Sequence, residues 1–129
     1  MIDGAVSSYR DLQVWRKSLD WAEAIYQATA RWPREERFGL SSQIRRSAIS
    51  VASNIAEGAA RRTTGEFAQF VGVAQGSLAE AETQLLLARR LGYIADGDAG
   101  GLLNASAEIS RMLAGLSSAL KRRKNAFSS

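Results

Sequence analysis

The sequence predicts an all-α protein built as an antiparallel, up-and-down four-helix bundle. Apolar residues recur at alternating steps of three and four along four separate segments, which is the period of one face of an α-helix. The segments are long and the links between them are short, which favours antiparallel neighbours in a bundle. No β-type alternation competes with this pattern. A chain of 129 residues is the right size for one such domain.

The first predicted helix begins near Asp11 and is stopped by Pro33, because the residue before a proline disfavours the helical conformation. A charged connection follows over residues 33–39. The stripe expected to face the core consists of Leu12, Trp15, Leu19, Ala22 and Tyr26, flanked by Ile25, Thr29 and Trp32.

The second predicted helix begins at Ser41 or Ser42, since either residue suits the N-cap position. Gly58 lies near its end, where a helix-ending glycine is common. Its expected core positions are Leu40, Ile44, Ala48, Val51 and Ile55. Beside them runs a second apolar strip of Ile49, Ala52, Ala56 and Ala59.

The third predicted helix has the clearest boundaries. Thr63 and Glu66 match a capping box, in which the hydroxyl accepts from a free amide and the carboxylate reaches back. Arg89 and Arg90 complement the helix dipole at the other end, and Gly92 closes the helix. Its expected core positions are Phe67, Val71, Ala74, Leu78, Ala81, Leu85 and Ala88.

The fourth predicted helix starts after a turn over Asp96, Gly97 and Asp98. Its expected core positions are Leu102, Ser106, Ile109, Leu113, Leu116 and Leu120. The bundle is therefore expected over residues 9–120, between a flexible N-terminus of residues 1–8 and a basic, frayed C-terminal tail of residues 121–129.

A stripe of small residues on the third helix is not needed by a lone bundle. It runs through Gly72, Gly76, Ala79 and Thr83 and leads to Leu86. A glycine inside a helix costs roughly 1 kcal/mol relative to alanine, so two of them one turn apart indicate that another backbone comes close. A tight contact within the bundle would explain this. A subunit interface explains it together with the extra apolar strip on the second helix, so we expect a homo-oligomer.

Short polar side chains also recur with heptad spacing. The second helix carries Gln43, Ser47, Ser50, Asn54 and Glu57, and the third carries Gln69, Glu80 and Gln84. Such short groups favour a hydrogen-bonded layer between helices or subunits over a merely hydrophilic face. The candidate structural and interface residues are Gln43, Arg46, Asn54, Glu57, Gly58, Gly72, Gly76 and Glu80.

Several kinds of chemistry are missing. The sequence contains no histidine and no cysteine, so it cannot build a Glu-x-x-His di-iron site or an ordinary zinc site. No serine clusters with a base, and the glycines form no phosphate loop. We therefore expect no catalytic residue, no metal, no cofactor and no enzymatic activity. No apolar run could span a bilayer and residues 1–10 lack the apolar core of a signal peptide, so a cytoplasmic protein without membrane contact is predicted.

The chain carries 17 lysines and arginines against 13 acidic residues, a net charge of +4 that permits nucleic-acid contact without requiring it. A basic run at the C-terminus can equally be a solubilising helix end. The candidate nucleic-acid-binding residues are Arg45, Arg61, Arg62, Arg89, Arg90, Lys121, Arg122, Arg123 and Lys124.

Specific strings add a resemblance to a known family. They are Asp11–Trp15, Trp32–Glu36, Phe38–Arg46, Asn54–Gly58 and Gly76–Glu80. In this order, over residues 9–120, they resemble the four-helix-bundle family of 23S rRNA-intervening sequence proteins, also labelled S23 ribosomal proteins. One departure is Ala52, where many relatives have a proline, so any kink made by that proline is not expected here.

The resemblance implies a bacterial protein that forms a homo-oligomer, commonly a pentamer, without established enzymatic activity. Some members of the family are encoded inside inserts of large-subunit rRNA genes. A related branch accompanies diversity-generating retroelements, where it binds reverse transcriptase and nucleic acid.

The expected function is a non-enzymatic oligomeric scaffold whose partners are further copies of itself and RNA or a nucleic-acid-handling protein. The alternative is a protein-only assembly module with no nucleic-acid role.

Overall fold

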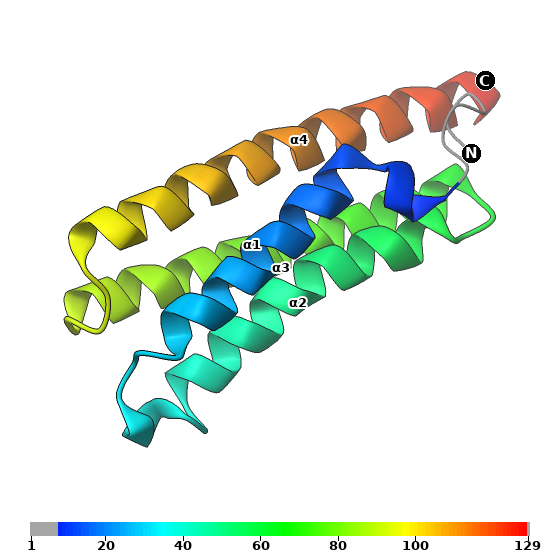
Figure 1. The fold of residues 1–129 in the computed structure, drawn as a ribbon. Helices are drawn as coiled ribbons and strands as arrows, with labels where there is room; N and C mark the ends of the chain where they lie inside the picture. The colour runs from blue at the N-terminus through cyan, green and yellow to red at the C-terminus, as the bar shows by residue number, and fades with distance from the viewer. Residues whose placement is uncertain (1–7, 129) are drawn as a thin grey trace.

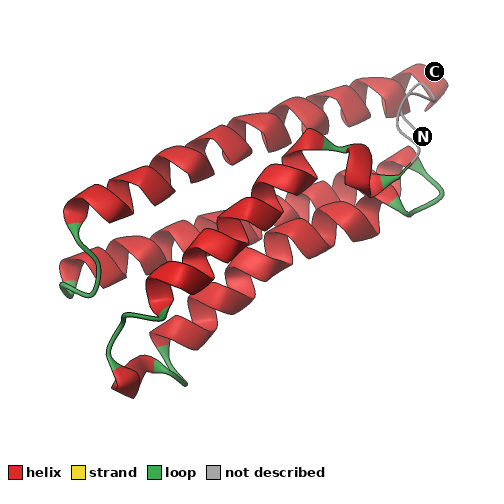
Figure 2. Ribbon diagram, in the orientation of Figure 1, coloured by secondary structure: helices red, strands yellow, loops and turns green. Residues whose placement is uncertain are grey.

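A computed structural model describes residues 8–128 and confirms the four-helix bundle (Figure 1). The helices are α1 (Gln13–Thr29), α2 (Leu40–Ala59), α3 (Thr64–Arg90) and α4 (Asp96–Ser128). Two short 3-10 turns, η1 (Tyr9–Asp11) and η2 (Arg34–Glu36), precede α1 and α2. Residues 8–128 contain no β-strand (Figure 2).

The helices are arranged so that each lies beside its neighbours in sequence. α1 packs against α2 and α4, and α3 packs against the same two helices, so α1 and α3 lie on a diagonal. The turn η1 and the last turns of α4 lie together with the α2–α3 link, residues 60–63, at what we call the terminal end (Figure 1). The links of residues 30–39 and 91–95 lie at the far end.

The predicted core faces of α2, α3 and α4 are confirmed. Ile44, Leu85 and Leu113 have no exposed surface, and Leu78 and Leu120 are nearly as deeply buried. Of the predicted positions on these helices, Phe67, Leu102 and Leu116 are partly buried and pack against the core. Burying apolar area of this kind is the main stabilising contribution to the bundle.

The core face of α1 differs from the prediction. Leu19 and Tyr26 are 48% and 40% exposed, because the helix is rotated away from the predicted stripe. The buried face includes two polar residues, Ser18 and Thr29, which a count of apolar residues passes over. The Thr29 hydroxyl is satisfied locally, since it donates to the Ile25 carbonyl at 2.8 Å. The buried residues of α1 are Val14, Ser18, Trp21, Ala22, Ile25 and Thr29.

The boundaries of α1 and α2 also differ from the prediction. α1 begins at Gln13 and ends at Thr29, before Pro33. α2 begins at Leu40, and neither Ser41 nor Ser42 caps it. The Glu36 carboxylate instead accepts the Leu40 amide at 3.0 Å, which gives α2 an acceptor from the preceding turn.

Glu36 also joins the two links at the far end. Its second carboxylate oxygen accepts the Tyr93 hydroxyl at 2.9 Å. The Leu40 amide, and then the Tyr93 hydroxyl, lower the pKa of Glu36, and the same bond raises the pKa of Tyr93. The charged carboxylate of Glu36 is thus the form that makes these two hydrogen bonds in the folded protein.

The predicted ends of α3 are confirmed. The Thr63 hydroxyl accepts the Glu66 amide at 3.1 Å, and it donates to the Glu66 carboxylate at 3.0 Å. The Glu66 carboxylate therefore reaches back to the Thr63 hydroxyl. Gly92 has φ of +78°, the left-handed conformation that a glycine adopts readily after a helix.

The turn predicted over Asp96, Gly97 and Asp98 is the first turn of α4, where acidic residues favour the helix dipole. The expectation of a frayed tail was wrong over residues 121–128, because α4 continues through Ser128. The flexible N-terminus predicted over residues 1–8 lies outside the described residues, apart from Ser8.

Gly58 has a different role from the predicted helix-ending one. It lies inside α2 and is buried. A Cβ atom at this position would lie 2.7 Å from the Phe70 Cβ and 3.0 Å from the Phe67 Cδ1. Glycine therefore lets α2 and α3 approach at this point.

We predict that Gly58→Ala destabilises the protein by about 1–3 kcal/mol, because the new methyl group overlaps α3. Gly115→Ala is the matched control. Gly115 lies in α4 with nothing within 4 Å of its Cβ position, so alanine there should be stabilising by up to about 1 kcal/mol. Urea denaturation of both variants measures the difference, and equal midpoints would contradict the close approach.

Candidate nucleic-acid interface

The structure divides the candidate nucleic-acid-binding residues between the two ends of the bundle. Arg61, Arg62 and the run Lys121–Lys124 lie at the terminal end. Arg45, Arg89 and Arg90 lie toward the far end. Since α2 rises about 1.5 Å per residue, the two groups are separated by roughly 20 Å or more. One short stretch of nucleic acid cannot contact all of them on one chain.

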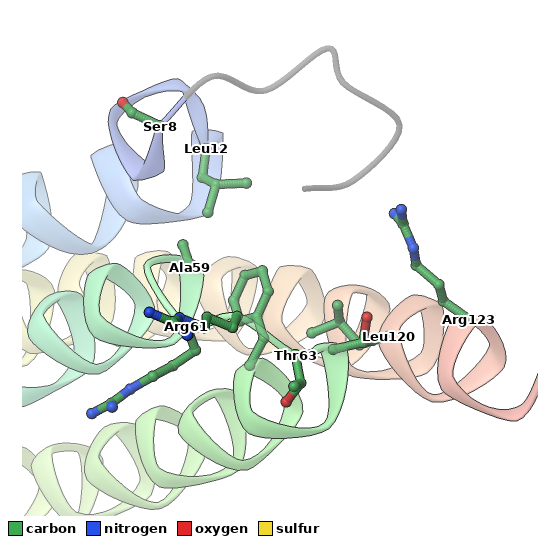
Figure 3. Close-up of a pocket in the computed structure, with 10 residues that line it drawn as sticks. Ser8, Leu12, Ala59, Arg61, Thr63, Leu120 and Arg123 are labelled. Atoms are coloured by element: carbon green, nitrogen blue, oxygen red, sulfur yellow. The ribbon is translucent and has the colours of Figure 1, made fainter. Parts of the chain in front are cut away.

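Three basic residues of the terminal end, Arg61, Arg62 and Arg123, line a small pocket of about 50 Å³. Figure 3 shows Arg61 on one side of this pocket and Arg123 of α4 on the other. The pocket floor is apolar and includes Leu12, Phe67 and Leu120. The pocket is too small for a base, so its chemistry is that of a rim of cations around an apolar centre.

The cations at this end differ in how far neighbouring side chains hold them. The Arg61 guanidinium pairs with the Glu57 carboxylate at 2.7 Å and lies 4.8 Å from the centre of the Phe70 ring. Among residues 8–128, the exposed Arg62 side chain has no hydrogen bond, ion pair or ring contact. The side chain of Lys124 lies over the first turn of α3, because its Nζ is 3.5 Å from where a Gly65 Cβ would be. Arg62 therefore presents its charge outward, and Lys121 and Arg122 are exposed as well.

Arg45 is engaged inside the protein. Its Nε donates to the Thr29 hydroxyl at 2.7 Å, and its Nη2 donates to the Tyr26 carbonyl at 3.1 Å. The guanidinium also lies 4.5 Å from the centre of the Tyr26 ring. It fastens α2 to the C-terminal end of α1, where a cation is favoured by the helix dipole. Arg89 and Arg90, by contrast, are exposed at the end of α3.

The predicted polar layer exists in a shorter form. The Asn54 amide donates to the Ser50 carbonyl at 2.8 Å and to the Ser50 hydroxyl at 2.9 Å. The Ser50 hydroxyl bonds to that of Ser77 on α3 at 2.8 Å, which links the two helices. Among the other residues predicted for this layer, Ser47 is buried and donates to the Gln43 carbonyl at 3.0 Å, and Gln84 is half-buried. The remaining ones, Gln43, Glu57, Gln69 and Glu80, are exposed, as is the interface candidate Arg46.

Ser77 is a structural residue that sequence reasoning missed. It lies inside the string Gly76–Glu80 but was not assigned to the polar stripe. Its spacing could have revealed it, since it lies seven residues before Gln84 and shares that residue's heptad position.

Neither glycine of the small-residue stripe of α3 packs against another part of the described chain. Gly72 and Gly76 are exposed, and nothing lies within 4 Å of a Cβ placed at either position. A tight contact inside the bundle therefore does not explain these glycines. Val73 and Leu87 on the same helix are 51% and 47% exposed, so the outer surface of α3 is also partly apolar.

On α2, the extra apolar strip divides between the core and the surface. Ala52 is buried, Ala56 and Ala59 are half-buried, and Ile49 is exposed. The strip is thus mostly explained by packing within the bundle.

Residues 8–128 contain neither a membrane-spanning helix nor a cluster of metal ligands. No helix in this range is long and apolar enough to cross a membrane. The same residues contain no group of three or more acidic side chains placed to hold a metal ion.

These features define a small helical-bundle protein with basic surfaces and an uncovered small-residue face. The chain belongs to the family of 23S rRNA-intervening sequence proteins, whose family model matches residues 10–115. It is similar to a protein of unknown function from the S23 ribosomal protein family of Bacteroides thetaiotaomicron, known from a crystal structure. The two are 29% identical with a TM-score of 0.73, over 81% of this chain and 97% of that one. No curated protein matches the chain.

We predict that Asn54→Ala destabilises the protein by about 1–2 kcal/mol, because it removes both bonds to Ser50. Glu57→Ala is the control on the next turn of α2, where loss of an exposed ion pair should change stability by less than about 0.5 kcal/mol. Thermal unfolding followed by circular dichroism compares them. Equal stability of the two variants would show that water replaces the Asn54 bonds without loss.

Proposed function

We propose that this protein is a non-enzymatic, homo-oligomeric scaffold that binds RNA, or a partner that handles nucleic acid, through its terminal end. The observation that carries the proposal is the gathering of Arg62 and the run Lys121–Lys124, from two separate segments, at one end of the bundle. The helical continuation of α4 supports it, because a helix holds these cations in a fixed array.

Arg62, Lys121, Arg122 and Arg123 form no ion pair among residues 8–128. Glu57 is occupied by Arg61, and the Glu66 carboxylate accepts from the Thr63 hydroxyl at the start of α3. An excess of cations attracts a polyanion at long range and releases its counterions on contact. A homo-oligomer would repeat this surface around its symmetry axis.

Contacts to phosphates, more than to bases, fit the exposed side chains. Trp21 and Trp32 are buried, so they cannot stack on bases. Phe38 is 86% exposed, but it lies at the far end. Binding at the terminal end should therefore be electrostatic and weakly selective.

The polar residues also support a role without catalysis. The hydroxyls of Ser50 and Ser77 bond to each other and to Asn54, with no base in the cluster. A serine nucleophile needs a base within hydrogen-bond reach.

The alternative, a protein-only assembly module, is favoured by a different observation. Val73, Leu87 and Leu91 expose apolar surface on and just after α3, near the uncovered glycines. An assembly surface is common to both functions, so the presence or absence of RNA binding decides between them.

We predict that the protein is a homo-oligomer, most simply a pentamer, with a mass near five times 14.0 kDa by size exclusion coupled to light scattering. Gly76→Leu should lower this mass while leaving the helical content unchanged, because the bundle itself has open space at that position. A wild-type protein that runs as a monomer at micromolar concentration would contradict the assembly.

We predict that RNA affinity falls steeply with salt, by a slope of roughly 0.7 in log K per log salt for each phosphate contacted on a single strand. Arg122→Gln with Arg123→Gln should weaken binding and flatten this slope. Arg89→Gln with Arg90→Gln makes the same charge change at the far end and should have a smaller effect. Fluorescence anisotropy of a mixed-sequence RNA at several salt concentrations measures both pairs, and no binding at low salt would favour the protein-only module.

A further inference from the structure

A second basic pocket lies at the far end of the bundle, between the end of α1, the turn η2 and the first turn of α2. Its volume is about 270 Å³. Three arginines line it, and no acidic residue does. The residues that matter here are Arg34, Arg37, Arg45, Ser41, Trp32 and Thr29.

We propose that this pocket binds a phosphate group. The inference goes beyond the proposed function, because it concerns a discrete site at the end opposite to the terminal end and does not require RNA binding there.

Arg45 supplies a cation that is already in position. Its bonds to the Thr29 hydroxyl and the Tyr26 carbonyl use Nε and Nη2 and fix the plane of the guanidinium. A guanidinium has five N–H donors in a rigid fork, so Arg45 keeps further donors. Little side-chain entropy remains to be lost when a ligand binds to them.

Arg34 and Arg37 supply two further charges at the pocket wall. Arg34 is exposed, and its side chain has no hydrogen bond, ion pair or ring contact among residues 8–128. The Arg37 guanidinium lies 4.8 Å from the centre of the Phe38 ring. Such a contact leaves the N–H donors at the edge of the guanidinium free. Both side chains can therefore turn toward an anion without breaking a hydrogen bond within the described chain.

Ser41 points independently to a ligand. It is 6% exposed and lines this pocket, yet neither its hydroxyl nor its amide has a hydrogen-bond partner among residues 8–128. It belongs to the first turn of the 20-residue helix α2, where amides lack intrahelical acceptors and the dipole favours an anion. Glu36 satisfies the Leu40 amide and leaves the Ser41 amide without an acceptor.

Trp32 also lines this pocket, together with the neighbouring pocket beside Tyr93. It is 6% exposed, and its Nε1 is buried without a partner. The Ser41 hydroxyl, in contrast, is not fully enclosed, so it is the unpartnered donor that an anion in the pocket can reach.

The nearby acids do not neutralise the pocket. Glu36 is held by the Leu40 amide and the Tyr93 hydroxyl and is not part of the pocket lining. Glu35 is exposed and also lies outside the lining. Three guanidiniums match the two negative charges of a phosphate monoester better than the single charge of a carboxylate. The tetrahedrally arranged oxygens of a phosphate can also accept hydrogen bonds from several donors at once.

Isothermal titration of the full chain with inorganic phosphate, against sodium chloride at equal ionic strength, tests the site. Arg34→Gln combined with Ser41→Ala should weaken phosphate binding by roughly tenfold or more, since one charged donor and one hydroxyl are lost. Arg31→Gln is the control, because Arg31 is exposed and close in sequence but does not line this pocket. Circular dichroism verifies that each variant keeps the wild-type helical content.

A phosphate could come from a nucleic acid or from a small phosphorylated molecule, and a second titration with single-stranded RNA separates these sources. Competition between RNA and inorganic phosphate, with weaker RNA binding in the Arg34 and Ser41 variant, would assign the site to a nucleic-acid phosphate. RNA binding that the variant leaves unchanged, with phosphate binding lost, would assign it to a small phosphorylated ligand. The Arg122 and Arg123 variant should retain phosphate binding even if the proposed RNA-binding function fails. Heats no larger than those of chloride, or equal phosphate affinity in variant and wild type, would overturn the proposal.

Discussion

The close approach of α2 to α3 is the constraint on which the rest of the bundle depends. Gly58 lies directly under Phe70 and Phe67, and nothing larger than a hydrogen atom fits there without displacing α3. Four and eight residues earlier in α2, Asn54 and Ser50 reach Ser77 through a short hydrogen-bonded chain. Steric fit thus sets the spacing of this helix pair, and the hydrogen bonds set which residues face each other.

A second set of interactions ties together the far end. The Glu36 carboxylate joins the start of α2 to Tyr93 in the α3–α4 link, and Arg45 joins α2 to the end of α1. The Glu36 carboxylate satisfies an amide that the start of α2 leaves without an acceptor, and the Arg45 cation lies at the C-terminal end of α1, where the helix dipole favours it. The pocket lined by Arg34, Arg37 and Arg45 lies between these contacts, so the same interactions that hold the links also shape a basic cavity.

The antiparallel topology decides how charge is distributed over the surface. It brings the α2–α3 link and the last turns of α4 to one end, although Arg62 and Arg122 are far apart in sequence. It sends Arg89 and Arg90 to the other end. Meanwhile the face of α3 that carries Gly72 and Gly76 points away from all three other helices. Basic ends and an uncovered small-residue face are thus separate surfaces, available to separate partners.

The sequence by itself determined the fold class, the faces of three helices and both ends of α3. These features depend on local periodicity and on capping residues, such as Thr63 and Gly92, that act within one turn of the chain. The tertiary structure decided which face of α1 is buried, because Ser18 occupies a core position that apolar periodicity cannot identify, while Leu19 and Tyr26 are exposed. It also decided that Gly58 permits close packing while Gly76 faces open space, and that Arg45 bonds to α1. The two glycines have the same intrinsic preferences, and only the presence or absence of a neighbouring helix distinguishes them.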